Sequence, residues 1–307
     1  MASGSSKAIA AALLANLGIA IAKFVGYVFT SSSSMLAESI HSVADTSNQA
    51  LLLLGSARAR KVETPEHPFG YGRERYFWSF VVALVLFMLG GLFAIYEGLH
   101  KLQQAAHEVS NVWWAIGILL LGLVLEGYSF RTAVKESRPL KGNASWWAFI
   151  RRSRTPELPV VLLEDFGALT GLVFALVGVS TAALTGDSRW DAYATISIGV
   201  LLVIIAVVLV LEMKSLIIGE SAIAPLRQRI VAAIEGTRGM GRVIHMRTQH
   251  IGPDQILVAA KVELDPSLDT AGVTATIDHA QERVREAVPI ATLIYLEPEA
   301  LEPEGSG

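Results

Sequence analysis

The chain has 307 residues, of which 52% are hydrophobic and 17% charged, with a formal net charge of −3. A soluble domain of this length carries about 25% charged residues, so we expect a membrane part beside a soluble part, and the small net charge gives no reason to predict a nucleic-acid partner. The absence of cysteine excludes disulfides, thiolate metal ligands and cysteine nucleophiles, so any metal site must use His, Asp, Glu, Asn or water.

Six segments are predicted to span a bilayer, because each holds roughly 20 mostly apolar residues. They are residues 8–30, 35–57, 76–99, 111–133, 158–184 and 191–213. The first segment continues past Phe24 and has no clear small-residue cleavage site, which indicates a retained helix rather than a signal peptide. The second segment is the least hydrophobic of the six.

Positive charge predicts how these segments are oriented. The two connections that follow the second and fourth segments are rich in it, with Arg58, Arg60, Lys61, Arg73, Arg75, Lys135, Arg138, Lys141, Arg151, Arg152 and Arg154. The alternate connections hold only Lys101 and Arg189. By the positive-inside rule both termini lie on the cytoplasmic side, in a bacterial inner membrane or in an organelle membrane of a eukaryote.

The long apolar segments end at about residue 215, and the mixed polar and apolar sequence that follows predicts a separate soluble domain. A helix over 222–236 precedes two strands, "RVIHMRTQHI" and "QILVAAKVEL", around a Gly-Pro-Asp turn signal. A second helix and the strand "ATLIYLEP" complete the order αββαβ. We therefore expect a membrane α-helical fold with a C-terminal α+β, ferredoxin-like domain. The expected bounds are 1–215 for the six-helix transmembrane domain, 216–299 for the cytoplasmic soluble domain and 300–307 for a disordered tail.

The second span carries a polar stripe. Glu38, His41, Asp45 and Asn48 are three, four and three residues apart, so they share one face of a helix. His41 and Asp45 can hold one ion from a single helix, as paired ligands do in zinc sites. Ionisable groups in a membrane are costly and usually face a cavity or a partner. The alternative is a buried polar network that only holds helices together.

The fifth span contributes Glu164 and Asp165 within an apolar run. Adjacent residues lie about 100° apart on a helix, so only one of them is expected to point squarely at a given site, although the longer Glu164 can curl round. If the second and fifth spans are neighbours, His41, Asp45 and Asp165 can meet around one cation. The alternative places Glu164 near the membrane end, in contact with water.

Two motifs carry a family resemblance. "SSSSMLAESIHSVADTSNQALLLLG" followed by "HPFGYGRERY", with six spans and an αββαβ domain, resembles the cation diffusion facilitator family over nearly the whole chain. The addition of "VLLEDFGALTG" makes the resemblance strongest to the branch that includes the mitochondrial zinc transporter of animals and its bacterial relatives. The resemblance implies a dimeric, non-enzymatic transporter that exchanges Zn²⁺ or related divalent ions for protons.

The family's transport site uses two residues four apart on the second span and two on the fifth. These positions fall on His41, Asp45 and Asp165, but the fourth falls on Val161, which cannot bind metal. Glu164 is the nearest replacement, and water, Asn48 or Asn16 are alternatives. Asn16, Asn48 and Glu38 are also candidates for supporting or pathway groups. Three carboxylates and one imidazole would make a harder site, which leaves Mn²⁺, Fe²⁺ or Co²⁺ open beside Zn²⁺.

Other sites of the family are incomplete in this sequence. His67 matches the first residue of a peripheral site, but Tyr71 replaces the second. In the soluble domain His245 and Glu297 match a binuclear site of some bacterial members. Ala260 and Tyr295 stand where that site would have histidines. We therefore expect the soluble-domain site to be absent or much weakened.

The sequence thus predicts a secondary active transporter that works by alternating access, with metal and protons competing for His41. Its partners are divalent metal ions, protons, the lipid bilayer and a second copy of the chain. No tightly bound cofactor is expected, since Zn²⁺ or another divalent cation is cargo. The competing class is a non-transporting metal-sensing membrane scaffold.

Overall fold

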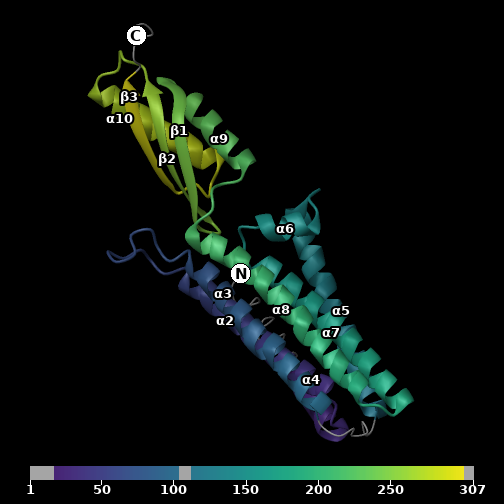
Figure 1. The fold of residues 1–307 in the computed structure, drawn as a ribbon. Coiled ribbons are helices and arrows are strands. Elements are labelled where there is room, and N and C mark those ends of the chain that lie inside the picture. Colours follow the sequence, from purple (N-terminus) through teal and green to yellow (C-terminus); the bar gives the residue numbers. More distant parts are fainter. Residues whose placement is uncertain (1–16, 104–111, 301–307) are drawn as a thin grey trace. The chain divides into compact units, whose positions relative to one another are not determined.

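The computed structural model describes residues 17–103 and 112–300 (Figure 1). The chain divides into two compact units. One contains Met1–Ala57 and Tyr76–Lys214, and the other contains Arg58–Arg75 and Ser215–Gly307. The first unit is helical and the second carries the sheet. The predicted tail begins at residue 300, and its residues 301–307 lie outside the described part, as does Asn16.

The helical unit is a bundle of long apolar helices. Its elements are Leu17–Thr30, α2 (Ser33–Arg58), α3 (Glu74–Val85), the π-helical η1 (Leu86–Leu92), α4 (Phe93–Gln103), α5 (Val112–Lys141), the short α6 (Trp146–Arg152), α7 (Glu157–Thr185) and α8 (Arg189–Ile218). In the described residues four helices are long and apolar enough to cross a membrane, namely Glu74–Gln103, which joins α3, η1 and α4, together with α5, α7 and α8. The helix Leu17–Thr30 is apolar but shorter.

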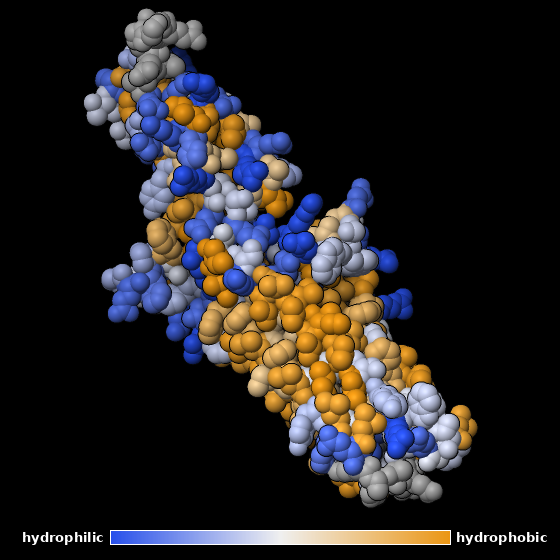
Figure 2. All heavy atoms as spheres, viewed as in Figure 1, coloured by the Kyte–Doolittle hydropathy of each residue, from blue (hydrophilic) through white to orange (hydrophobic). Residues whose placement is uncertain are grey.

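Burial in this unit follows the expectation for a helical membrane domain. Small and aliphatic side chains such as Ala83, Leu119, Leu172 and Leu202 form one core cluster between the helices. Large apolar side chains also cover the outside of the unit, where Figure 2 shows a broad hydrophobic surface over the helices. Such an extended apolar surface is typical of a membrane protein.

A carboxylate from α8 closes the N-terminal end of α2. Asp191 is fully buried. Its Oδ2 accepts a hydrogen bond from the backbone N–H of Ser33 at 2.8 Å, and its Oδ1 accepts one from the Ser32 hydroxyl at 2.9 Å. Ser34 also donates to Oδ1. The serine run before the second span therefore surrounds one buried aspartate, which caps the helix with a negative charge where unpaired N–H groups are exposed.

The second unit has the predicted order αββαβ. Its elements are α9 (Ala224–Glu235), β1 (Met240–Gly252), β2 (Gln255–Leu264), α10 (Thr270–Ala287) and β3 (Leu293–Ala300). The sheet order is β1-β2-β3, with β1 antiparallel and β3 parallel to β2. A complete ferredoxin-like sheet places a further strand inside the βαβ unit, whereas here β2 and β3 are direct neighbours. The expected fold is therefore present only in part.

The connection between α2 and α3 groups with the second unit, which the sequence does not indicate. A Cβ on Gly72 would lie 3.0 Å from the carbonyl oxygen of Ile251, and one on Gly252 would lie 2.9 Å from the Cα of Gly72. Side chains at either position would push the two backbones apart. Nearby, Arg75 donates to Asp254 at 2.7 Å, at the turn between β1 and β2. The close backbone approach thus explains the second glycine of "HPFGYGRERY", which is Gly72.

Candidate metal site

The polar stripe of α2 is buried in the bundle. Glu38 and Asn48 are fully buried and His41 is 1% exposed. The Nε2 atom of His41 lies 3.5 Å from Oδ2 of Asp45, which is long for a hydrogen bond. The spacing of three and four residues therefore places these side chains together, as the sequence predicts.

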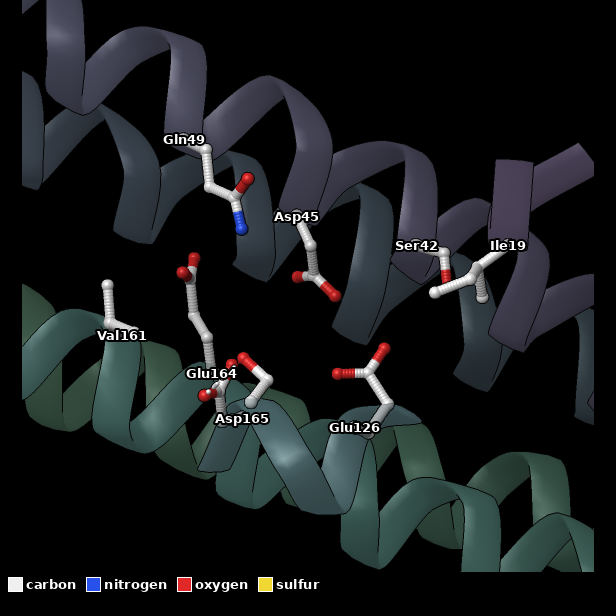
Figure 3. A pocket seen from close by; sticks show the side chains of 9 residues that line it. Ile19, Ser42, Asp45, Gln49, Glu126, Val161, Glu164 and Asp165 are labelled. Atoms are coloured by element: carbon white, nitrogen blue, oxygen red, sulfur yellow. Dashed lines mark hydrogen bonds between the residues drawn. The ribbon is translucent and has the colours of Figure 1, made fainter. Parts of the chain in front are cut away.

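A pocket opens beside this stripe, between α2, α5, α7 and the helix Leu17–Thr30. Its lining residues are Ile19, Ser42, Asp45, Gln49, Glu126, Ser129, Val161, Glu164 and Asp165. Figure 3 shows the carboxylate of Asp45 pointing into the gap from α2 and that of Glu126 pointing toward it from α5. The pocket thus joins the two predicted clusters and adds a third helix.

Glu164 and Asp165 both line this pocket. Asn48 donates from Nδ2 to Oε1 of Glu164 at 2.6 Å. Ser129 donates from Oγ to Oδ2 of Asp165 at 3.0 Å. The pocket is bordered by α2 and α5 as well as by α7. Two adjacent residues of α7 can therefore reach it from opposite sides, Glu164 from the α2 side and Asp165 from the α5 side.

The sequence reasoning missed four polar residues of the pocket lining, namely Ser42, Gln49, Glu126 and Ser129. Glu126 is an isolated acid in the apolar run "ILLLGLVLEGYSF", and the membrane cost that identified the α2 stripe applies to it equally. Gln49 lies four residues after Asp45, so the spacing that defines the stripe also places it on that face of the helix. Val161 lines the pocket near Glu164 with an apolar side chain, so the position of the absent ligand is part of the pocket wall (Figure 3).

Glu38 belongs to a separate ion pair rather than to the pocket lining. Lys23, also fully buried, donates to Oε2 of Glu38 at 3.1 Å and to the Ser42 hydroxyl at 2.7 Å. A Cβ on Gly171 would lie 2.5 Å from Oε1 of Glu38, so α7 needs a glycine where this carboxylate passes. Lys23 was not identified from the sequence, because its partner lies on a different helix.

Several side-chain atoms that could bind a metal ion have no hydrogen-bond partner among the described residues. They are Oδ1 of Asp45, Oδ1 of Asn48 and both ring nitrogens of His41. Buried polar atoms are normally satisfied, so unpaired ones suggest a missing ion or water. Carboxylate, amide and imidazole groups suit a borderline or hard divalent cation. In the described residues no three acidic or histidine side chains are close enough to hold an ion, so binding requires side-chain movement.

The weaker candidates lie away from this pocket. The ring of His67 lies 4.6 Å from that of Tyr71, between ring centroids, in the loop after α2. His245 and Glu297 are both register partners of Lys261, which stands between them in the sheet. A lysine between two candidate ligands disfavours a cation there. Arg247 also donates to Nε2 of His245 at 3.0 Å.

Comparison with known proteins identifies the helical unit. Residues 9–218 match the family described as the cation efflux transmembrane domain. The human protein named "Proton-coupled zinc antiporter SLC30A9, mitochondrial" is 29% identical over 267 residues, which are 85% of this chain and 46% of that protein. "Metal tolerance protein C4" of Arabidopsis thaliana is 28% identical over 265 residues, 85% of this chain and 57% of that protein.

This chain therefore spans about half the length of these curated relatives. Among solved structures, the C-terminal domain of MamM in a copper form matches with a TM-score of 0.24 and 24% identity, over 25% of this chain and 96% of that domain. The family model covers most of the helical unit, including the complete α2 stripe and the α7 carboxylates. The chain is a membrane protein that belongs to the cation efflux family.

Proposed function

We propose that the chain is a secondary active transporter that exchanges divalent cations for protons by alternating access, with Zn²⁺ as the first candidate for its cargo. The observation that carries the proposal is the pocket lined by Asp45, Glu164 and Asp165, next to the buried His41, whose ring nitrogens have no hydrogen-bond partner among the described residues. A scaffold that only holds helices together has no need for unpaired ligands.

In this proposal His41, Asp45 and Asp165 bind the cargo, and Glu164 contributes a further oxygen. A cation that enters the bundle loses water, and the charged ligands compensate for that loss. Asn48 holds one oxygen of Glu164 and so orients its carboxylate. The high share of oxygen ligands supports Mn²⁺, Fe²⁺ or Co²⁺ as alternative cargo.

Proton exchange follows from competition for the same atoms. His41 must be neutral to bind a metal ion, and the carboxylates bind either a metal ion or protons. Release of the metal on one side therefore frees these groups to take up protons. The relative named a proton-coupled zinc antiporter supports this coupling, since this chain matches it over 267 residues.

The wider architecture is part of the proposal. We infer six spans with both termini on the cytoplasmic side, in which α2 spans despite its polarity. Residues 8–16 of the predicted first span lie outside the described residues. Residues 1–215 would form the transport domain. Residues 216–299, with their small αββαβ fold, would act as a cytoplasmic, ferredoxin-like dimerisation module that joins two copies, because a small domain gains stability by association.

The decisive experiment is flux in proteoliposomes that contain the full chain. An imposed pH gradient should drive Zn²⁺ movement, and metal movement should in turn drive protons. Replacement of Glu164 by Gln should weaken Zn²⁺ affinity, since the amide lacks the charge. Glu136→Gln, on the exposed side of α5, is the control.

Metal binding without flux in either direction would refute transport and support a metal-sensing scaffold. A panel of Zn²⁺, Mn²⁺, Fe²⁺ and Co²⁺ in the same assay ranks the cargo. Normal affinity in the Glu164→Gln variant would remove Glu164 from the ligand set while leaving the transport proposal intact.

A further inference from the structure

Glu126 has no role in the ligand set inferred from the sequence, yet it faces the pocket. It is half-buried on α5, opposite Asp45 (Figure 3). It has no hydrogen-bond or ion-pair partner in residues 17–103 and 112–300. The buried lysine of the bundle, Lys23, is already paired with Glu38. A carboxylate at this depth therefore lacks a protein partner that would offset its cost.

Glu126 cannot reach water by extending along its helix. It lies about 20 Å from Val112 along the axis of α5, at a rise of about 1.5 Å per residue. The other end of the helix, Lys141, is at a similar distance. A glutamate side chain is far too short to reach a headgroup region from there, so it must point into the bundle.

A second observation points to a ligand at the same place. His41 is 1% exposed, and neither ring nitrogen has a hydrogen-bond partner in the described residues. Its Nε2 lies 3.5 Å from Asp45, whose other carboxylate oxygen is also unpaired. The carboxylates of Asp45 and Glu126 line the pocket, and the imidazole of His41 lies next to Asp45. These groups are electron-pair donors with no described hydrogen-bond donor to satisfy Glu126, Oδ1 of Asp45 or the His41 ring.

We propose that Glu126 is a ligand of the transported cation and replaces the side chain that is absent at Val161. This inference rests on the proposed transport function. The ion would lie between Asp45, Glu126 and Asp165, on the side of the pocket away from Val161. Three helices, rather than two, would then hold the cargo. The site would be rich in oxygen and would accept hard ions such as Mn²⁺ more readily than a site with two imidazoles.

The test compares affinity and selectivity in full-length variants. Glu126→Gln should weaken Zn²⁺ and Mn²⁺ binding about tenfold or more, since even the loss of a group that supports a ligand costs about 10–100-fold. Glu126→His should restore Zn²⁺ binding but not Mn²⁺ binding, because imidazole suits Zn²⁺. Glu136→Gln, an exposed acid of the same helix, should leave both affinities unchanged. Isothermal titration calorimetry measures the binding affinities, and a proteoliposome assay measures the flux.

A double variant tests the replacement directly. Val161→His supplies an imidazole on α7, so Glu126→Gln should cost less than about twofold in Zn²⁺ affinity on that background. Equal costs on both backgrounds would overturn the replacement. Unchanged affinities and an unchanged Zn²⁺-to-Mn²⁺ ratio in Glu126→Gln would overturn the ligand role, as would slower flux with normal binding.

The design separates this inference from the transport proposal. Flux by the unmodified chain that is lost in Asp45→Ala supports transport whatever Glu126 does. If Glu126→Gln does not fold, the Zn²⁺-to-Mn²⁺ ratio of Glu126→Asp and Glu126→His decides the matter. A ratio equal to that of the unmodified chain in both variants would overturn the inference.

Discussion

Two buried polar clusters on the same helix, α2, differ in how well their atoms are satisfied. At the start of the helix both oxygens of Asp191 accept hydrogen bonds, and Lys101 lies 3.7 Å from Oδ2. In the middle of the helix one oxygen of Asp45 and both nitrogens of His41 have no hydrogen-bond partner among the described residues. Each cluster contains a carboxylate in an apolar bundle, so polarity alone does not separate them.

The difference indicates two different roles. A carboxylate surrounded by hydroxyl groups, a backbone N–H and a lysine is compensated within the protein, and it fixes the geometry of α2 against α8. A carboxylate beside other carboxylates and an unpaired imidazole requires a cation or protons from outside. The first arrangement supports the structure, and the second suits binding and release.

The largest effect is expected from Asp45→Ala. Loss of a charged ligand should reduce pH-driven Zn²⁺ flux by at least about 100-fold, the upper range for loss of a group that only supports a ligand. The thermal stability of the metal-free protein should fall little, because the contact of this carboxylate with His41 is long, with Nε2 3.5 Å from Oδ2. A flux assay checks the expected loss of transport, and a melting curve in detergent checks the thermal stability. Normal flux would sink the site assignment.

Asp191→Ala should give the opposite pattern. Removing one partner of a buried ionic network costs about 3–5 kcal/mol, since Lys101 and the serine hydroxyls lose their acceptor. Unfolding in detergent with increasing denaturant measures this cost. Flux per folded molecule should match that of the unmodified chain. A variant as stable as the original would contradict the structural role of this cluster.

The pair of Lys23 and Glu38 lies between these extremes, with one satisfied and one unpaired carboxylate oxygen. Lys23→Met should cost about 3 kcal/mol, because Glu38 is left buried without its cation. Adding Glu38→Gln should recover part of that loss. The same unfolding assay applies. If the double variant is no more stable than the single one, the two side chains are not coupled.

Ser129→Ala should have a smaller effect. It removes the hydrogen bond that orients Asp165, and a bond to a charged group contributes about 1.5 kcal/mol. Zn²⁺ affinity should weaken by about three- to tenfold, while stability changes little. Titration calorimetry measures the affinity, and Ser197→Ala, on an exposed turn of α8, is a matched control. An unchanged affinity would show that Asp165 needs no orienting partner.

The smallest effect concerns an exposed carboxylate in the second unit. The backbone N–H and hydroxyl of Ser267 both donate to Asp265 and lower its pKa below the ordinary value. Its contribution to stability is therefore present above the ordinary pKa of about 3.9 and is lost as the pH falls through the lowered pKa. Ser267→Ala should raise the pKa toward the ordinary value, measured by carboxyl ¹³C chemical shifts of labelled aspartate. An unmoved titration would exclude these hydrogen bonds as the cause.

Local sequence patterns predicted the polar helix face, the order of elements in the second unit and the family. The spacing of Glu38, His41, Asp45 and Asn48 placed them on one helix face, because a helix repeats every 3.6 residues. The order αββαβ was readable from turn signals and apolar periodicity, and β1, β2 and α10 lie where these patterns predict them. Family membership rested on contiguous motifs, which the match over residues 9–218 confirms.

Tertiary structure decided which helix faces meet. Only the packing of α2, α5 and α7 brings Asp45, Glu126 and Asp165 to one pocket. The packing of α2 against the helix Leu17–Thr30 pairs Glu38 with Lys23, and its packing against α8 brings the serine run to Asp191. A single ionisable residue in an apolar run shows that a partner is needed but does not say which helix supplies it. The sequence by itself determined the faces, because periodicity is local. The contacts between faces depend on how side chains of separate helices fit together, which no local pattern encodes.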